Sequence, residues 1–331
     1  MNSILFLILL SVALSFVLTY LIKEYSLRKK ILAEPNERSL HEKPTPTGGG
    51  VAIVFVWYLG ISILFLSGII EKELFYALLC GALIAVISLI DDIFSLSPLL
   101  RLIVHFISSI SALWLLGGLR PIIIPEFEMN YTYIIYPLAI IGMVWFINLF
   151  NFMDGVDGFA SVQAIIISLV MFIFTGGISN ILLIACITGF LFWNWPKARI
   201  FMGDVGSTQL GFILVVLGIY FHNKLEFSIL NWIMLASPFW FDATLTLFRR
   251  WRNGEKLSEA HRKHAYQRFV QAGFTHQKLI FVLIGVNSIN ILFISIYREI
   301  KILQIPLFIL TLLFYYFLTR QVDKKVPFKK G

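Results

Sequence analysis

The 331-residue sequence contains few charged residues, and long uninterrupted apolar runs take their place. Asp, Glu, Lys and Arg make up 14% of the chain, whereas soluble domains carry about 25%. The hydrophobic fraction is 58%, and the mean hydropathy is +0.84. A water-soluble core cannot absorb that much apolar surface. The composition therefore excludes a soluble protein and predicts an all-α integral membrane protein, with residues 1–331 forming one polytopic domain.

Cysteine is nearly absent as well. Cys80 and Cys186 each lie alone inside an apolar run, without a CxxC motif, a metal-ligand partner or a disulfide framework, so we expect two small core residues. The net charge of +8 is compatible with an anionic partner. A membrane protein that obeys the positive-inside rule carries the same excess, and we therefore expect a bilayer partner and no nucleic acid.

Apolar runs long enough to cross the hydrocarbon recur along the whole chain. Basic residues follow the first run and none precedes it, so it does not resemble a cleaved signal peptide. We predict about eleven transmembrane helices, over residues 3–22, 49–67, 74–90, 102–117, 133–149, 159–175, 180–194, 207–221, 229–246, 278–296 and 302–319.

The charges predict an orientation and the side that carries the site. Of the 27 Lys and Arg residues, 22 fall on one side of the predicted topology and five on the other, which places the N-terminus outside and the C-terminus in the cytoplasm. The twelve Glu divide evenly, but all seven Asp lie on the cytoplasmic side. Short carboxylates gathered at one membrane face predict an active site in the cytoplasmic loops.

Two adjacent carboxylates, Asp91 and Asp92, end the third predicted span. Such a pair is costly after an apolar run unless it is bonded or binds a metal. A solvated helix end is the structural alternative. The DDxxD metal motif of prenyl diphosphate synthases is excluded because the third Asp is missing.

A second polar motif runs from Asn148 to Gly158. Its spacing of three places Asn148, Asn151 and Asp154 along one face of a helix end. The stretch contains no Lys or Arg, so Asp154 and Asp157 need a cation or donors from elsewhere in the chain. CDP-alcohol phosphotransferases also carry an Asp-Gly motif, but their following Ala-Arg is absent.

Glycines flank two further motifs. Asp204 lies between Gly203 and Gly206 at the predicted start of a helix, where it can hold a metal-bound phosphate; a plain helix cap is the alternative. Earlier in the chain, Lys43-Pro-Thr-Pro-Thr47 leads into three glycines whose amides can face an anion. Close helix packing explains these glycines equally well.

The last motif is a basic loop from Arg249 to Gln267 that contains His261, Arg262 and His264. On a helix, the two imidazoles share one face. We expect them to contact phosphate or sugar hydroxyls. A zinc pair is disfavoured because further ligands are lacking, and a simple positive-inside excess is the other alternative.

In this order, the motifs between about residues 36 and 275 resemble the polyprenyl-phosphate N-acetylhexosamine-1-phosphate transferase superfamily, or glycosyltransferase family 4. The superfamily includes the MraY translocase and the WecA-type and WbpL-type initiators of surface glycans. The resemblance implies Mg²⁺, with Mn²⁺ as an alternative. It also implies a UDP-N-acetylhexosamine donor, a polyprenyl (undecaprenyl) phosphate acceptor, UMP as product and a bacterial cytoplasmic membrane. It leaves a homodimer open.

The resemblance also implies residue roles. Asp91 and Asp92 would be the catalytic pair that faces the acceptor phosphate, and Asp204 with Asn151 would ligate the metal. Phe201 would stack on uracil. The residues implied to bind nucleotide and sugar phosphate are Lys43, Thr47, Gly48, Asn148, Asp154, Asp157, Phe201, His261, Arg262 and His264.

One departure from the MraY pattern indicates which branch of the superfamily the sequence resembles. MraY carries three consecutive histidines in its late loop, whereas this chain has His261-Arg262-Lys263-His264. That favours a glycan-initiating enzyme of O-antigen or cell-wall polymer synthesis, using UDP-GlcNAc or a deoxy relative such as UDP-FucNAc or UDP-QuiNAc. The alternatives are an MraY-type phospho-MurNAc-pentapeptide transferase and a cation-coupled transporter, whose carboxylates should lie near the bilayer midplane.

Overall fold

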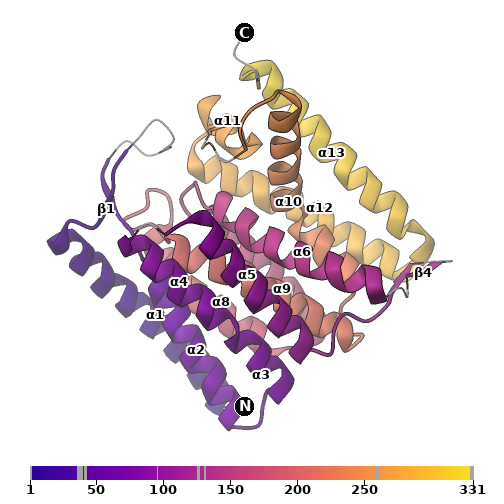
Figure 1. Cartoon of the computed structure of the whole chain (residues 1–331), viewed down its shortest axis with the longest axis horizontal. Helices are drawn as coiled ribbons and strands as arrows, with labels where there is room; N and C mark the ends of the chain where they lie inside the picture. The colour runs from indigo at the N-terminus through magenta and orange to yellow at the C-terminus, as the bar shows by residue number, and fades with distance from the viewer. Residues whose placement is uncertain are drawn as a thin grey trace.

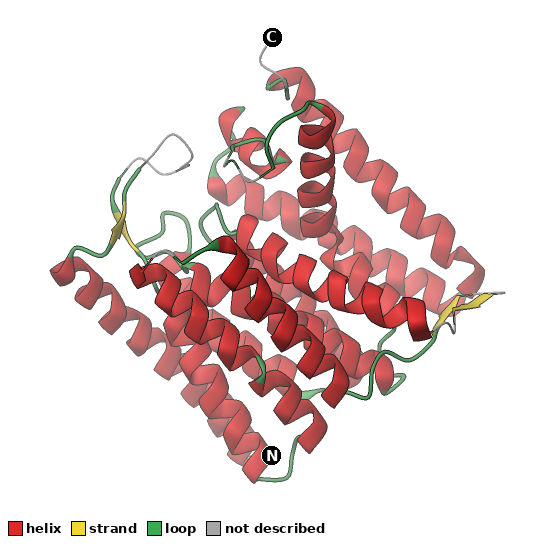
Figure 2. Ribbon diagram, in the orientation of Figure 1, coloured by secondary structure: helices red, strands yellow, loops and turns green. Residues whose placement is uncertain are grey.

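The computed structural model describes residues 2–35, 40, 43–94, 96–124, 127–129, 132–257, 259 and 261–328. Nearly all of them are helical (Figure 2). The helices are α1 (Asn2–Lys29), α2 (Gly50–Leu66), α3 (Lys72–Leu79), α4 (Gly81–Phe94), α5 (Pro98–Leu115), α6 (Thr132–Phe152), α7 (Phe159–Thr175), α8 (Ile178–Asn194), α9 (Asp204–Asn223), α10 (Ile229–Arg252), α11 (Ala265–Gln271), α12 (His276–Glu299), the short 3₁₀ helix η1 (Lys301–Leu303) and α13 (Gln304–Lys325).

The described strands form two small antiparallel hairpins at different edges of the molecule (Figure 2). Strand β1 (Leu32–Ala33) pairs with β2 (Thr45–Pro46), and β3 (Ile122–Ile124) pairs with β4 (Phe127–Met129). The predicted all-α class is therefore confirmed.

In the described part of the chain, seven helical segments are long and apolar enough to cross a membrane: α1, α3 with α4, α5, α6, α9, α12 and η1 with α13. Three shorter apolar helices, α2, α7 and α8, have 17 residues each. Each predicted span coincides with a helix or a pair of helices. A multi-pass membrane protein is thus confirmed, while the number eleven and the outside N-terminus stay predictions.

The third predicted span is interrupted rather than straight, because α3 ends at Leu79 and α4 begins at Gly81. A Cβ at Gly81 would come within 2.5 Å of Phe212 and 2.6 Å of Gln209, both on α9. Glycine at this position therefore lets α4 approach α9 closely. Both cysteines are free thiols; Cys186 is buried in the core, as expected, and Cys80 is half-buried.

Helix α9 lies at the centre of the bundle, with α4, α5 and α6 in front of it (Figure 1). In its most apolar stretch 94% of the residues are buried, compared with 17% in α1 at the periphery. A helix that is apolar all round belongs in a core. Because α9 begins at Asp204, the central helix brings this carboxylate into the middle of the surrounding helix ends.

Helix α1 packs mainly against α8, which follows much later in the chain. A Cβ at Gly189 would come within 2.5 Å of the Val12 carbonyl oxygen. The Ser15 hydroxyl donates to the Cys186 carbonyl at 2.6 Å. Small residues on both helices therefore allow close approach and an interhelical hydrogen bond.

Candidate active site

Two cavities lie side by side where α4, α5, α6, α9 and α10 end or begin, and they share Asn151, Phe152, Asp204 and Gln267. We name them by their polar residues. The acidic cavity measures about 330 Å³, and its other lining residues include Thr47, Asp154, Asp157, Asn194, Phe201, Tyr266 and His276. The histidine cavity measures about 470 Å³, and its other lining residues include Ser88, Arg101, His105, Asn148, His261 and His264.

The junction between the two cavities combines Asp204, Asn151 and Arg101. The Ser207 hydroxyl donates to the Asn151 Oδ1 atom at 2.8 Å, which joins α9 to α6. The Arg101 Nη1 atom lies 3.4 Å from Asp204 Oδ2 and 2.5 Å from Asp91 Oδ2. One guanidinium on α5 therefore links the carboxylates of two predicted motifs.

The adjacent carboxylates Asp91 and Asp92 have different surroundings. Asp91 accepts a backbone hydrogen bond from Leu96 at 2.7 Å in addition to its bond with Arg101, and its side chain is 12% exposed. Asp92 is exposed and makes no hydrogen bond or ion pair with a described residue. Neither residue is among those lining the two cavities, although Arg101 connects Asp91 to them.

The carboxylates of the loop after α6 also differ. Asp157 Oδ2 accepts from the Ala198 amide at 3.1 Å and lies 3.0 Å from His276 Nδ1, so its partners come from distant segments, as the loop composition required. Asp154 accepts no hydrogen bond from the described residues. Burial, together with the nearby carboxylates of Asp204 and Asp157, raises the pKa of Asp154 well above its usual range.

The glycine run before α2 packs against the loop that leads into α9. The Gly49 and Gly50 amides donate to the Phe201 and Met202 carbonyls at 2.9 and 2.8 Å. A Cβ at Gly50 would lie 2.4 Å from the Cα atom of Gly206. The packing interpretation is therefore confirmed for Gly49 and Gly50.

The remaining residues of this motif lie differently. Gly48 has a φ of +93°, and its backbone amide faces Gly203. Thr47 lines the acidic cavity, as does Phe201 from the facing loop. Lys43 is exposed and is not among the lining residues of either cavity.

The expectation that His261 and His264 share a helix face is wrong, because α11 begins only at Ala265 and His264 is its extended N-cap residue. The two rings are nevertheless neighbours, with centroids 4.9 Å apart, and both line the histidine cavity. Arg262 is not among the lining residues of either cavity.

His261 is uncharged at neutral pH. Burial, with the nearby His264, Arg250 and Lys263 side chains, lowers the pKa of His261 to about 3. Its Nδ1 atom accepts from the Lys263 amide at 3.2 Å, so the neutral ring carries its proton on Nε2.

Three arginines in or next to the basic loop hold parts of the protein together. Arg250 is 2% exposed and donates to Glu255 and to the carbonyls of residues 256, 257 and 259. Arg249 and Arg268 bind Asp323 near the end of α13. Among the described residues, the guanidinium that lines the acidic or the histidine cavity is instead Arg101.

Sequence reasoning missed Arg101, His105, Asp242, Gln267 and His276. The sequence carried a signal for Arg101 and His105, because they are four residues apart on one helix and therefore lie on the same face. His105 Nδ1 lies 3.2 Å from Asn148 Nδ2. Gln267 and His276 carry no comparable local signal.

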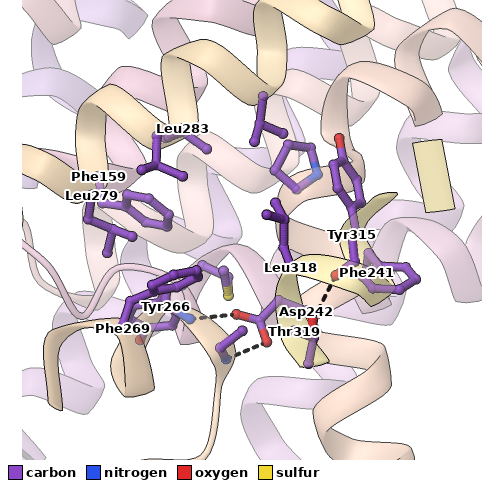
Figure 3. Close-up of a pocket in the computed structure, with 15 residues that line it drawn as sticks. Phe159, Phe241, Asp242, Tyr266, Phe269, Leu279, Leu283, Tyr315, Leu318 and Thr319 are labelled. Carbon is purple, nitrogen blue, oxygen red and sulfur yellow. Dashed lines mark hydrogen bonds between the residues drawn. The ribbon is translucent and has the colours of Figure 1, made fainter. Parts of the chain in front are cut away.

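Asp242 connects α10 to the start of α11. Its carboxylate accepts from the Ala265 amide at 2.7 Å and from the Tyr266 amide at 3.1 Å (Figure 3). The apolar pocket beside it is small, about 90 Å³, and is lined by residues such as Phe159, Leu279 and Leu283. Asp242 therefore supports the site without lining either of the two larger cavities.

Comparisons with known proteins agree with this arrangement. Residues 74–222 match the model of glycosyl transferase family 4. The chain is 29% identical to a probable undecaprenyl-phosphate N-acetylglucosaminyl 1-phosphate transferase of Bacillus subtilis, over 81% of this chain and 77% of the relative. It is 28% identical to an undecaprenyl-phosphate alpha-N-acetylglucosaminyl 1-phosphate transferase of Thermotoga maritima, over 77% and 79%.

A third relative is named for a different polyprenyl lipid. The chain is 27% identical to a decaprenyl-phosphate N-acetylglucosaminephosphotransferase of Mycolicibacterium smegmatis, over 80% of this chain and 75% of the relative. The matches cover the α3–α9 region that carries Asp91, Asn151 and Asp204. These similarities support the polyprenyl-phosphate N-acetylhexosamine-1-phosphate transferase superfamily as the family of this chain.

Proposed function

We propose that the protein transfers N-acetylhexosamine 1-phosphate from a UDP-sugar to undecaprenyl phosphate at the cytoplasmic face of the bacterial cytoplasmic membrane, releasing UMP. The observation that carries this proposal is the meeting of two cavities at Asp204 and Asn151, with Arg101 between Asp204 and Asp91. A reaction between two phosphorylated substrates needs such a junction, because both phosphates must reach one point.

We assign the acidic cavity to the uridine end of the donor. Phe201 offers an aromatic ring there, and Asp157 can accept from a base amide. The histidine cavity would take the sugar, with Asn148 and the neutral His261 ring as hydrogen-bonding groups. It extends past apolar residues such as Leu102 and Leu247, a suitable approach for a lipid phosphate.

The junction suits a hard divalent cation, which we propose to be Mg²⁺, with Mn²⁺ as the alternative. Asp204 and Asn151 supply oxygen donors, which Mg²⁺ prefers. No group of three His, Cys, Asp or Glu side chains in the described part of the chain could hold a metal ion alone. This agrees with the usual Mg²⁺ site of one or two carboxylates completed by substrate phosphates. Bound there, the ion would offset phosphate charge.

Chemistry at phosphorus does not require a general base here. The second pKa of a phosphate monoester is near 6, so the lipid phosphate is largely ionised at neutral pH. Its oxygen attacks the donor's β-phosphorus, a new phosphoanhydride forms, the α–β anhydride breaks, and UMP leaves with the bond electrons. Because Asp91 is already bonded to Arg101 and Leu96, we assign it the role of positioning.

Electrostatic stabilisation of the phosphates lowers the remaining barrier to attack. The two substrates bring about three to four negative charges together, so a cation at the junction is needed before attack. Arg101 is the side chain best placed to bind the negatively charged phosphates, since it already bridges Asp91 and Asp204. Its planar fork can transfer a hydrogen bond from carboxylate to phosphate.

The sugar and the branch are part of the proposal. The names of the relatives favour UDP-GlcNAc, with UDP-FucNAc and UDP-QuiNAc as deoxy alternatives. The interrupted histidine run at 261–264 argues against an MraY-type pentapeptide transferase. The carboxylates lie at the ends of α4, α6 and α9 rather than at mid-helix, which argues against an ion-coupled transporter.

The test is product identity. Purified protein would be incubated with undecaprenyl phosphate, Mg²⁺ and a panel of UDP-sugars, and nucleotide products would be separated. We expect UMP from one N-acetylhexosamine donor, and exchange of labelled UMP into that donor only when lipid phosphate and metal are present. UDP as the first product would show transfer at the sugar's anomeric carbon and would refute the proposal.

A further inference from the structure

One carboxylate near the C-terminal end of α13 joins three helices. The two Asp323 oxygens accept from Arg249 Nη1 and Nη2 at 3.1 and 3.0 Å. Arg268 Nη1 donates to Asp323 Oδ1 at 2.6 Å. Arg249 belongs to α10 and Arg268 to α11, and Figure 1 shows α13 reaching the same end of the molecule as α11.

The residues after α13 complete this contact. The Val326 carbonyl accepts from Arg268 Nη1 at 3.0 Å. The Phe328 ring is 7% exposed, and the guanidinium carbons of Arg249 and Arg268 lie 4.0 and 5.4 Å from its centroid. Cations within about 6 Å of a ring centroid are attracted by its face. We refer to Asp323, Val326 and Phe328 as the C-terminal clasp.

Burial makes α11 depend on this clasp. Arg268 is 2% exposed, and a charge removed from water needs a bonded partner. Among the described residues, the hydrogen-bond acceptors of its guanidinium are Asp323 and the Val326 carbonyl. A helix of seven residues is also too short to be stable by itself, so its anchors determine where it lies.

Helix α11 borders both cavities of the candidate active site. Gln267 lines the two of them, and Tyr266 lines the acidic cavity while its hydroxyl donates to the Phe152 carbonyl at 2.8 Å. Asp242 of α10 holds the first turn of α11 (Figure 3). The clasp holds the following turn through Arg268.

We infer that the C-terminal clasp is a positioning device for the active site: it sets the orientation of α11 and thereby the places of Gln267 and Tyr266 against the substrates. The inference rests on the proposed function. Asp323 and Phe328 line neither substrate cavity, so they are positioning residues that act through Arg268. The structure thus assigns a role in turnover to residues more than fifty positions beyond the helix they control.

Four variants test this inference in the full-length protein. Asp323→Asn removes the charge at nearly constant shape, Phe328→Ala removes the ring, and Asp323→Glu is the conservative rescue. Lys324→Gln is the matched control, because Lys324 is exposed on the same turn and bonds to no described residue. We expect Asp323→Asn to lower turnover about tenfold, equal to about 1.4 kcal/mol of barrier. Asp323→Glu, which keeps the charge, should retain more of the wild-type turnover than Asp323→Asn. Lys324→Gln should match the wild type.

Hydrogen–deuterium exchange separates positioning from general stability. We expect Asp323→Asn to accelerate amide exchange in residues 261–272 and to leave α7 and α9 unchanged. Unchanged exchange in 261–272, or acceleration throughout the bundle, would overturn the inference. This measurement needs no substrate, so its result stands even if the wild-type protein fails the UMP assay, which would refute the proposed function alone.

Discussion

The two sides of the candidate site are built by different means. Around Asp204, the chain is held by backbone hydrogen bonds and by glycines that touch each other, as at Gly50 and Gly206. Around His261, the described residues between 249 and 271 are held by side chains, chiefly arginines bonded to carboxylates and carbonyls. A backbone contact has no room for substitution, whereas a side-chain contact can be replaced. This difference predicts that the side around Asp204 tolerates few substitutions, whereas the side around His261 tolerates more.

The largest effect should come from the phosphate side. Asp204→Asn removes the charge at the junction but keeps the shape, so the protein should remain folded while turnover falls more than about 100-fold, on the order of 2.7 kcal/mol of barrier. Initial rates at saturating substrates and the melting temperature in detergent would be compared. Activity within about tenfold of the wild type would contradict a metal role for Asp204.

Backbone packing on that side gives the next prediction. Gly50→Ala places a Cβ 2.4 Å from the Gly206 Cα atom, and overpacking of this kind costs about 1–3 kcal/mol of stability. The control is Gly142→Ala, since a Cβ at Gly142 meets nothing within 4 Å. Thermal unfolding should show a lower midpoint for the first variant only. Equal midpoints would mean that the close approach is not rigid.

A smaller effect is expected at Asp157, which lines the acidic cavity together with His276. His276→Gln replaces the ring that lies 3.0 Å from Asp157 with a side chain that can still donate. We expect KM for the UDP-sugar to rise by about threefold to fivefold, under 1 kcal/mol, with kcat unchanged. His276→Ala should raise it further. A fall in kcat at constant KM would place His276 in the chemical step instead.

The effect that is smallest at neutral pH, and grows only as the pH falls, concerns His261 on the sugar side. The pKa of His261 is about 3 in the folded protein and about 6.5 when unfolded, so between these values the unfolded state binds the extra proton and stability falls as the pH falls. His261→Gln should therefore flatten the pH dependence of the unfolding midpoint below about pH 6.5. If the wild-type and variant curves remain parallel from pH 7 to pH 4, His261 is charged in the folded protein.

Local patterns predicted the membrane class, the helix positions and several of the polar residues around the cavities, because apolar length and polar spacing are properties of short segments. Asn148 and Asn151 are an example, since three-residue spacing on α6 brings both to the histidine cavity. The link between Asp91 and Asp204 through Arg101 was not predictable, because it depends on how α4, α5 and α9 pack. The sequence showed a basic residue there but not its partners.

The basic loop shows the opposite failure. Its basic composition was compatible with phosphate binding, yet Arg249, Arg250 and the adjoining Arg268 are each bonded within the protein. A guanidinium binds a carboxylate, a carbonyl or a phosphate equally well, so composition alone cannot distinguish the three. Asp242 and Asp323, which hold the loop, lie outside it on α10 and α13 and had no local signal.

The pairing of α1 with α8 has a consequence for biosynthesis. Ser15 and its hydrogen-bond partner Cys186 are 171 residues apart, so at about 5–20 residues per second α1 precedes its partner by roughly 9 to 34 s. During that interval α1 must persist in the bilayer without its main partner, with α2 as an earlier neighbour. Two of its hydroxyls need no partner on another helix, because Ser11 and Thr19 each donate to the carbonyl four residues earlier. The bundle can therefore close only after its eighth helix has been inserted.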